Sequence, residues 1–182
     1  MSKIRKLFFP FSILLNMGLF AIMWKQQKHV PYRKNHSIES AFSESNHSPR
    51  WLLEQSISQA RETLDIAIYN FDDAAIAESL IKAKHRGLHI RVLIDETKAT
   101  KKKVKQLLSQ LTKNGIPVRR YATGKMHLKM TIIDQTTLTI GSFNYTYASV
   151  NENIEQLFKV SNRSEALKWT AVFNELWDVS QS

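Results

Sequence analysis

The sequence predicts an α/β sandwich with a mixed central β-sheet over residues 50–182. Two patterns follow one another along these residues. In one, apolar side chains recur at every second position, as in a strand; in the other, they form an apolar stripe at helical spacing. Strands and helices that follow one another in this way are typical of a sheet covered by helices. No internal repeat is evident, so one chain is expected to hold one copy of any site that the domain carries.

The first two helices flank a strand. An apolar stripe over residues 51–60 predicts the first helix. In residues 63–69, TLDIAIY, the apolar side chains of Leu64, Ile66 and Ile68 recur at every second position and so share one face, which indicates a strand. Asp72 or Asp73 can then cap a second helix through its side chain, and this helix is expected to end near Gly87.

The middle of the domain continues the alternation. Residues 88–94 form a short apolar stretch that predicts a second strand. Residues 101–114 carry a strong apolar stripe, and Gly115 is a typical stop for the helix that this stripe predicts. Residues 117–121 are expected to form another short strand.

The last part of the chain predicts three strands and a closing helix. Two strands are expected close together, at residues 127–134 and 137–142. Residues 156–160 also have a strand pattern, and residues 165–177 have the apolar stripe of an amphipathic helix.

Composition narrows the classes of partner and of chemistry. The chain has 182 residues with a formal net charge of +10, of which residues 1–49 and residues 50–182 each contribute +5. The excess favours a polyanionic partner, such as nucleic acid or an anionic lipid surface. The chain has no cysteine, which excludes disulfides, thiolate nucleophiles and cysteine-based zinc sites.

The amino terminus has the sequence of a membrane element. Residues 7–24 are uncharged and predominantly apolar, and a helix of that length spans about 27 Å, close to the thickness of a bilayer core. The run lacks a small-x-small cleavage pattern, and Trp24 with Lys25 is typical of an interfacial anchor. We therefore expect residues 1–24 to be a membrane anchor or an uncleaved signal. Cleavage, which would give a secreted protein, is the alternative.

The remaining segments complete the expected organisation. Residues 25–49 are polar and rich in serine, so they are interpreted as a tether between the membrane and the domain at residues 50–182. Basic residues lie on both sides of the apolar run and give little help with its orientation. The domain is expected on the periplasmic or another extracytoplasmic side of the membrane.

Residues 127–144, HLKMTIIDQTTLTIGSFN, hold the candidate site residues, which are His127, Lys129, Asp134, Gly141, Ser142 and Asn144. Side chains alternate along a strand, so His127 and Lys129 should project from the same face. By the same alternation Asp134 should lie with the core-facing residues, which makes it a poor candidate for contact with a substrate. A structural role at the turn that follows is the expected alternative for Asp134.

This set of side chains suits an anionic ligand. The His127 imidazole can act as a nucleophile or proton carrier near neutral pH, and the Lys129 ammonium can neutralise charge that develops on a phosphate oxygen. Ser142 and Asn144 offer further hydrogen-bond donors to the same anion. All these groups are donors or cations, which indicates an anion-binding site.

The spacing H-x-K-x4-D-x6-G-S-x-N resembles the signature of the phospholipase D superfamily, often called the HKD motif. The continuation GSFNYT, followed by Asn153-Ile154-Glu155-Gln156, is similar to the short bacterial endonuclease branch of that superfamily. That branch has Asn-x-Glu-Asn at this place, so Gln156 departs from it. The resemblance covers residues 50–178 and implies a phospholipase D-like α/β/α sandwich with one HKD half-site per chain.

The resemblance also implies a mechanism. One histidine attacks phosphorus to form a phosphohistidine, a second histidine protonates the leaving oxygen, and water releases the phosphate. In this chain Lys129, Asn144 and Ser142 would hold the non-bridging oxygens, and Glu155 would hydrogen-bond His127. No metal or other cofactor is expected. Because nucleophile and acid must stand on opposite sides of phosphorus, a chain with one motif is expected to form a homodimer.

Three functions remain open at this point. The first is a metal-independent endonuclease acting on DNA or RNA, and the second is a membrane-anchored phospholipase D or cardiolipin hydrolase acting on phospholipid headgroups. The third is a nucleic-acid-binding protein without catalytic activity, against which the intact motif argues. The aromatic residues Phe143, Tyr145 and Tyr147 could stack on bases, or belong to the core or to an interface.

Overall fold

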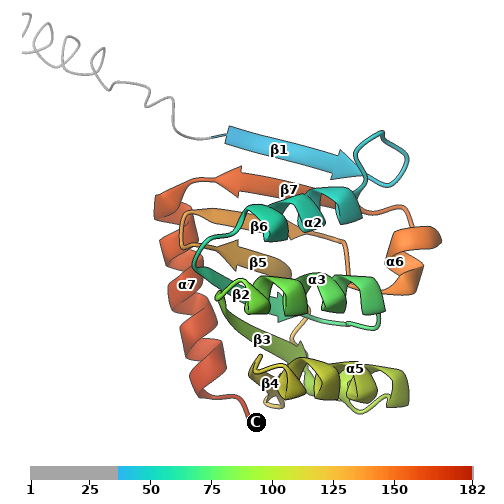
Figure 1. The fold of residues 1–182 in the computed structure, drawn as a ribbon, viewed down its shortest axis with the longest axis vertical. Helices are drawn as coiled ribbons and strands as arrows, with labels where there is room; N and C mark the ends of the chain where they lie inside the picture. Colours follow the sequence, from blue (N-terminus) through green and yellow to red (C-terminus); the bar gives the residue numbers. More distant parts are fainter. Residues whose placement is uncertain (1–36, 182) are drawn as a thin grey trace, which may run out of the picture. The chain divides into compact units, whose positions relative to one another are not determined.

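A seven-stranded mixed β-sheet forms the centre of the computed structural model, which describes residues 37–181 (Figure 1). The strand order is β1-β7-β6-β5-β2-β3-β4. β2, β3 and β4 are parallel to one another, and the other neighbouring pairs are antiparallel. The strands are β1 (Ser37–Phe42), β2 (Thr63–Ile68), β3 (His89–Asp95), β4 (Val118–Tyr121), β5 (Lys129–Ile133), β6 (Thr137–Gly141) and β7 (Gln156–Ser161).

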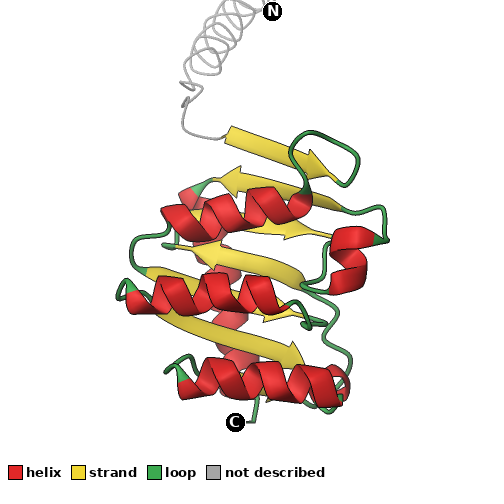
Figure 2. Cartoon of the chain, turned by 45° about the vertical axis from the view of Figure 1, so that its right-hand side comes forward, coloured by secondary structure: helices red, strands yellow, loops and turns green. Residues whose placement is uncertain are grey.

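Helices cover both faces of the sheet, which confirms the predicted α/β/α sandwich. α2, α3 and α5 lie side by side on one face, and α7 crosses the other face (Figures 1 and 2). Two short helices, α4 and α6, lie in connections between strands. The helices are α2 (Pro49–Gln59), α3 (Ala74–His85), α4 (Glu96–Ala99), α5 (Lys102–Lys113), α6 (Tyr147–Asn151) and α7 (Arg163–Asp178).

Burial on both faces explains the apolar strand sequences. In β2, Leu64, Ile66 and Ile68 belong to the cluster under α2, α3 and α5, whereas Ala67 packs in the cluster under α7. In β5, Met130 and Ile132 also belong to the cluster under α7. The alternation therefore sorts side chains between two cores, as expected for a sheet covered on both sides.

The local signals at helix ends act as predicted. The side chain of Asp73 accepts hydrogen bonds from the N–H groups of Ala75 and Ile76 and so caps α3. Gly87 and Gly115 follow α3 and α5 with φ angles of 99° and 76°. These angles favour glycine, which explains why the two helices end there.

Residues 37–42 differ from the expected polar tether. They form β1, which pairs antiparallel with β7 in a register that joins Ser37 to Ser161 and Phe42 to Gln156. Of the six side chains in β1 only that of Ala41 is buried. Since this edge strand is held by backbone hydrogen bonds rather than by an apolar face, its sequence carries little strand pattern.

The predicted membrane-anchored location is corrected. Among residues 37–181, no helix has both the length and the apolar character needed to cross a bilayer. Residues 1–24, to which the anchor was assigned, lie outside the described residues, so no anchor is shown. The expected extracytoplasmic placement at a membrane is therefore not retained.

Candidate active site

The candidate site lies at one edge of the sheet, where five strands bring their ends together. β2, β3 and β6 end at this edge, whereas β5 and β7 begin there because they run in the opposite direction. His127 and Lys129 stand at the start of β5, Ser142 and Asn144 follow β6, and Glu155 precedes β7. The topology alone therefore collects the predicted site residues at the edge where α/β sheets bind ligands.

His127 is exposed at this edge, with its ring set against that of Tyr69. The two ring centroids are 4.5 Å apart at an interplanar angle of 70°, an edge-on contact. The backbone N–H of Tyr69 donates to the carbonyl oxygen of Leu128 at 2.8 Å, one step beyond the last paired residues of β2 and β5. The end of β2 therefore fixes the backbone beside His127 and leaves the imidazole accessible.

The surroundings lower the pKa of His127 below its ordinary value of 6.5. Partial loss of solvent is the largest cause, followed by the ammonium groups of Lys129 and Lys125, with a smaller effect from Lys98. The carboxylate of Asp95 acts in the opposite direction. A lower pKa favours the neutral imidazole, which is the form that can attack an electrophile.

Lys129 lies almost buried behind His127. Its side chain donates to the carbonyl oxygen of His127 at 3.1 Å, and its Nζ lies 5.0 Å from the centroid of the Tyr69 ring. Burial lowers the pKa of Lys129, the nearby Glu155 opposes this effect, and Lys125 adds to it. The residue thus presents a partly desolvated positive charge, which acts more strongly on an anion than a fully hydrated one.

Glu155 forms the centre of a buried hydrogen-bond network. One carboxylate oxygen accepts from the hydroxyl of Ser142, and the other accepts from Ser149 Oγ at 2.9 Å and Asn153 Nδ2 at 3.1 Å. The expected hydrogen bond to His127 is not formed among the described residues. Glu155 instead holds the loops after β6 and before β7 and supports the charge of Lys129.

Ser142 has both its backbone and its side chain engaged with β7. Its N–H donates to the carbonyl oxygen of Gln156 at 3.1 Å, and its hydroxyl oxygen accepts from the N–H of Gln156 at 3.1 Å. Its hydroxyl hydrogen is already directed at Glu155, so Ser142 acts here on the protein rather than on an open anion site. Gly141 permits this close approach, since a Cβ there would lie 2.2 Å from the Gln156 carbonyl oxygen.

Asn144 has unused hydrogen-bonding capacity. Its side-chain oxygen is buried and has no partner among the described residues. Its neighbours Phe143 and Tyr145 are both buried in the core under α2 and α3, so neither is available to stack on a base. The Tyr145 hydroxyl is hydrogen-bonded to the hydroxyl of Thr131 in β5, which anchors the loop that carries Asn144.

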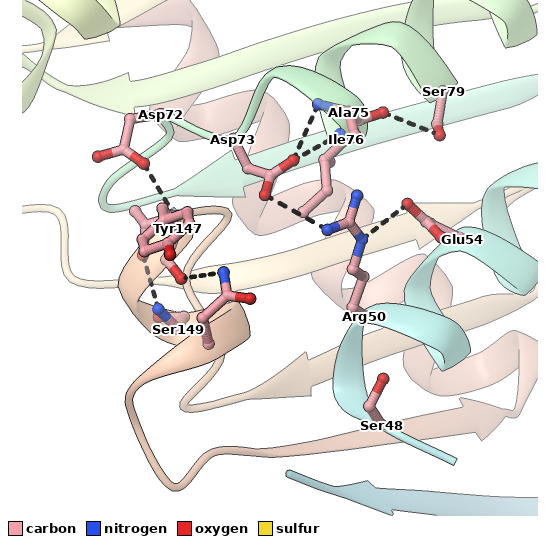
Figure 3. A network of polar contacts seen from close by, with 12 residues as sticks. Ser48, Arg50, Glu54, Asp72, Asp73, Ala75, Ile76, Ser79, Tyr147 and Ser149 are labelled. Atoms are coloured by element: carbon pink, nitrogen blue, oxygen red, sulfur yellow. Dashed lines mark hydrogen bonds and ion pairs between the residues drawn. The ribbon is translucent and has the colours of Figure 1, made fainter. Parts of the chain in front are cut away.

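The short helix α6, which supplies Ser149, is tied to the helices on its side of the sheet. Asp72 accepts from the N–H of Tyr147, the first residue of α6, at 3.0 Å (Figure 3). The adjacent Asp73 caps α3 and lies 3.7 Å from a guanidinium nitrogen of Arg50 in α2. This network fixes the position from which Ser149 reaches the buried carboxylate.

Asp134 belongs to the motif but not to the site. It lies beyond the opposite end of β5, where its carboxylate accepts from the N–H groups of Arg61, Glu62 and Thr63 at 3.0, 2.8 and 2.9 Å. Asp134 and Gln135 have φ angles of 50° and 51° and form the turn between β5 and β6. The expectation of a structural role at this turn agrees with the geometry.

Asp95 is a site element that the motif does not contain. It ends β3, is fully buried, and accepts from the N–H of Thr97 at 3.0 Å and from the Thr97 hydroxyl. Its second oxygen accepts from the N–H of Met126 at 3.0 Å. Because Met126 directly precedes His127, Asp95 holds the backbone from which the imidazole projects.

Sequence reasoning missed four neighbours of His127, namely Tyr69, Asp95, Lys98 and Lys125. One signal could have found two of them. Tyr69 and Asp95 stand at the carboxyl ends of adjacent parallel strands, which is the usual ligand side of such a sheet. The two lysines lie in short connections without a pattern. No group of three or more His, Cys, Asp or Glu residues in positions 37–181 is arranged to hold a metal ion.

Comparison with known proteins agrees with this geometry. A family model described as "Cardiolipin synthase, PLD-like domain" matches residues 53–177. The chain belongs to the phospholipase D superfamily. Members of this superfamily are phosphodiesterases, and the chain is a phosphodiesterase of this class. The alternative of a binding protein without catalytic activity is thereby set aside.

Two kinds of relatives are similar over most of the chain. A phospholipase D of Rickettsia typhi is 26% identical over 158 residues, 86% of this chain and 76% of the relative. A mitochondrial cardiolipin hydrolase of Chlamydomonas reinhardtii is 26% identical over 168 residues, 89% and 74% of the two chains. The crystal structure of Nuc from Salmonella typhimurium, a phospholipase D family member, has a TM-score of 0.77 and 26% identity, covering 80% of this chain and 97% of that one.

Proposed function

We propose that this phosphodiesterase is a metal-independent endonuclease that hydrolyses DNA or RNA through a phosphohistidine intermediate. The observation that carries the proposal is the exposed imidazole of His127, which faces solvent among the ammonium groups of Lys98, Lys125 and Lys129. A chain of phosphodiesters brings the negative charge that this arrangement favours. The similarity to Nuc over nearly the whole of that chain supports the same assignment.

The proposed reaction has two displacements at phosphorus. In the first, a neutral imidazole nitrogen of His127 attacks phosphorus, the bond to the leaving oxygen breaks, and a second histidine gives that oxygen a proton. In the second, water attacks phosphorus, the phosphorus–nitrogen bond breaks, and the second histidine takes the proton from water. The ammonium group of Lys129 neutralises charge on the non-bridging oxygens, and the side-chain NH2 of Asn144 donates hydrogen bonds to them.

A homodimer supplies the second histidine in this proposal. The sequence holds one His-x-Lys motif, and an attacking group and an acid must stand on opposite sides of phosphorus. Two copies of the edge that carries His127 would face each other across the substrate. Ser142 and Glu155 then act as positioning residues, since their hydrogen bonds fix the loops around the site rather than reach outward.

A lipid phosphodiesterase is the second candidate. Relatives named phospholipase D and mitochondrial cardiolipin hydrolase are 26% identical over more than four-fifths of this chain. Phospholipid headgroups contain the same phosphodiester, so His127 and Lys129 would act on them in the same way. Cardiolipin, with two phosphates, is the lipid probe that tests this candidate most directly.

The test compares the full chain with His127→Ala and with His85→Ala, a matched change of an exposed histidine at the end of α3. Each protein is incubated in excess EDTA with single- and double-stranded DNA, with RNA, and with vesicles that contain cardiolipin. We expect wild type and His85→Ala to cleave nucleic acid and His127→Ala to be inactive. Cleavage of cardiolipin alone would transfer the assignment to the lipid candidate.

The homodimer is tested with mixed dimers. Wild-type and His127→Ala chains are mixed in varying proportions at constant total protein, under conditions that allow exchange. Activity is then measured against the mole fraction of wild-type chain. If both histidines are needed at one phosphorus, activity falls with the square of the wild-type fraction. A linear fall, or full activity of a monomer in sedimentation, would contradict a shared site.

A further inference from the structure

Tyr69 is the centre of a cluster of positive charges that extends beyond the HKD motif. The Nζ atoms of Lys98, Lys129 and Lys125 lie 4.7, 5.0 and 5.3 Å from the centroid of its ring. The four residues come from four different segments: the end of β2, helix α4, the start of β5 and the loop before His127. The fold therefore assembles this cluster, which we call the lysine cluster.

The charges of the lysine cluster are not balanced by ion pairs. None of the three lysines is ion-paired within residues 37–181, whereas Lys103, Lys159 and others there are. The nearby carboxylates of Asp95 and Glu155 are occupied by hydrogen bonds from the protein itself. The ring of Tyr69 attracts cations only weakly compared with an anion. The charges of the lysine cluster are therefore left without an acidic partner among the described residues, and an anionic ligand would supply one.

The lysines divide into two kinds by their environment. Lys129 is almost buried and donates to the backbone of His127, which places it at the reacting phosphate. Lys98 is half-buried and Lys125 is exposed, and neither side chain has a hydrogen-bond partner among the described residues. No two of the three nitrogens can be farther apart than twice 5.3 Å, since all surround one ring centroid. An anion held by Lys98 and Lys125 would therefore lie beside a phosphate held by Lys129.

We propose that Lys98 and Lys125 bind a second phosphate of the substrate, next to the one that His127 attacks. This inference rests on the proposed function, whose nucleic-acid substrates carry a phosphate on each side of any internal scissile bond. By holding this second phosphate, the subsite positions the strand so that the scissile phosphate lies at the imidazole. A simple diester with one phosphate lacks the group that this subsite binds.

The experiment compares two substrates that differ in the second phosphate. Bis(p-nitrophenyl) phosphate has one phosphodiester, and a single-stranded thymidine decamer has neighbouring phosphates. The full chain is compared with the double variant Lys98→Ala/Lys125→Ala and with Lys82→Ala/Lys113→Ala. The latter removes two exposed lysines in the last turns of α3 and α5, at the end of the sheet opposite the site. Each protein is assayed at the pH of its own maximum.

Support for the subsite has three parts. The KM of the Lys98→Ala/Lys125→Ala variant for the decamer rises at least tenfold, and its kcat/KM falls at least tenfold more for the decamer than for bis(p-nitrophenyl) phosphate. The slope of log KM against log salt concentration falls by about 1.4, because each lost contact to a single strand removes about 0.7. The control variant behaves as wild type, and Lys98→Arg/Lys125→Arg, which keeps both charges, restores the decamer KM to within threefold.

Other results overturn the inference in distinct ways. An unchanged decamer KM in the alanine variant removes the subsite. Equal losses on both substrates, in a variant whose thermal unfolding matches wild type, would place the lysines at the reacting phosphate. Wild-type cleavage of bis(p-nitrophenyl) phosphate and of cardiolipin vesicles, but not of the decamer, would assign the second phosphate to a lipid. Failure of wild type on all three substrates contradicts the proposed function itself.

Discussion

Replacing Asp134 by asparagine is expected to weaken the fold and to leave the chemistry intact. The carboxylate accepts three backbone hydrogen bonds of 2.8–3.0 Å from consecutive residues before β2. Asparagine keeps one acceptor oxygen, for Glu62 and Thr63, but its NH2 group would face the N–H of Arg61. A hydrogen bond to a charged group contributes about 1.5–3 kcal/mol, and the remaining two would lose their charge assistance. Since water can reach Arg61 and Glu62, we expect a net loss of about 2–3 kcal/mol.

Urea unfolding and steady-state kinetics together test this prediction. Asparagine tolerates the φ angle of 50° at this turn, so the change isolates the carboxylate from backbone strain. With an m-value of about 2 kcal/mol/M, the urea midpoint should fall by roughly 1–1.5 M. The kcat should change less than twofold, because about 17 Å of strand separates Asp134 from Lys129. A large loss of kcat with an unchanged midpoint would refute the structural role.

Three further predictions address the site. Lys125→Ala should raise the pKa of His127, because it removes a positive charge that lowers it, and the acidic limb of the kcat/KM profile should move to higher pH. Gly141→Ala should lower the free energy of unfolding, measured by thermal unfolding, by about 3 kcal/mol or more, because its Cβ would lie 2.2 Å from a carbonyl oxygen of β7. Gly124→Ala should leave the free energy of unfolding nearly unchanged, because the nearest atom to its Cβ would be 3.9 Å away. Asp95→Asn should lower kcat by roughly 10- to 100-fold with little change in KM, because it loosens the backbone before His127.

The parts of the fold with strong periodicity could be predicted from the sequence. The stripe of residues 102–113 and the alternation of 63–68 have clear periods because each element buries a face in a core. β1 and the short helices α4 and α6 have no such face and could not be predicted. Their positions depend on partners distant in sequence, such as the pairing of β1 with β7.

The site was predictable to the extent that it is local in sequence. His127, Lys129, Ser142 and Asn144 lie on one hairpin, so spacing and strand direction bring them to the same edge. Tyr69 and the lysines reach the site through separate connections, and only the three-dimensional order of the strands brings them there. Alternation predicted Asp134 among the core-facing residues, whereas it lies apart from the site because it stands in the turn at the opposite end of β5. The sequence could not show that Glu155 accepts hydrogen bonds from serine and asparagine side chains rather than from a histidine.

The charges around His127 also bear on how one residue type could serve as both nucleophile and acid. In the proposed homodimer two copies of His127 face one phosphorus, and one must be neutral while the other carries a proton. Without substrate, partial loss of solvent and then the nearby lysines lower the pKa of this imidazole and favour the neutral form. A bound phosphodiester brings negative charge between the two rings, which raises the pKa of both. The substrate therefore helps one ring to keep the proton that it later gives to the leaving oxygen. The other ring, in its neutral form, can then attack phosphorus.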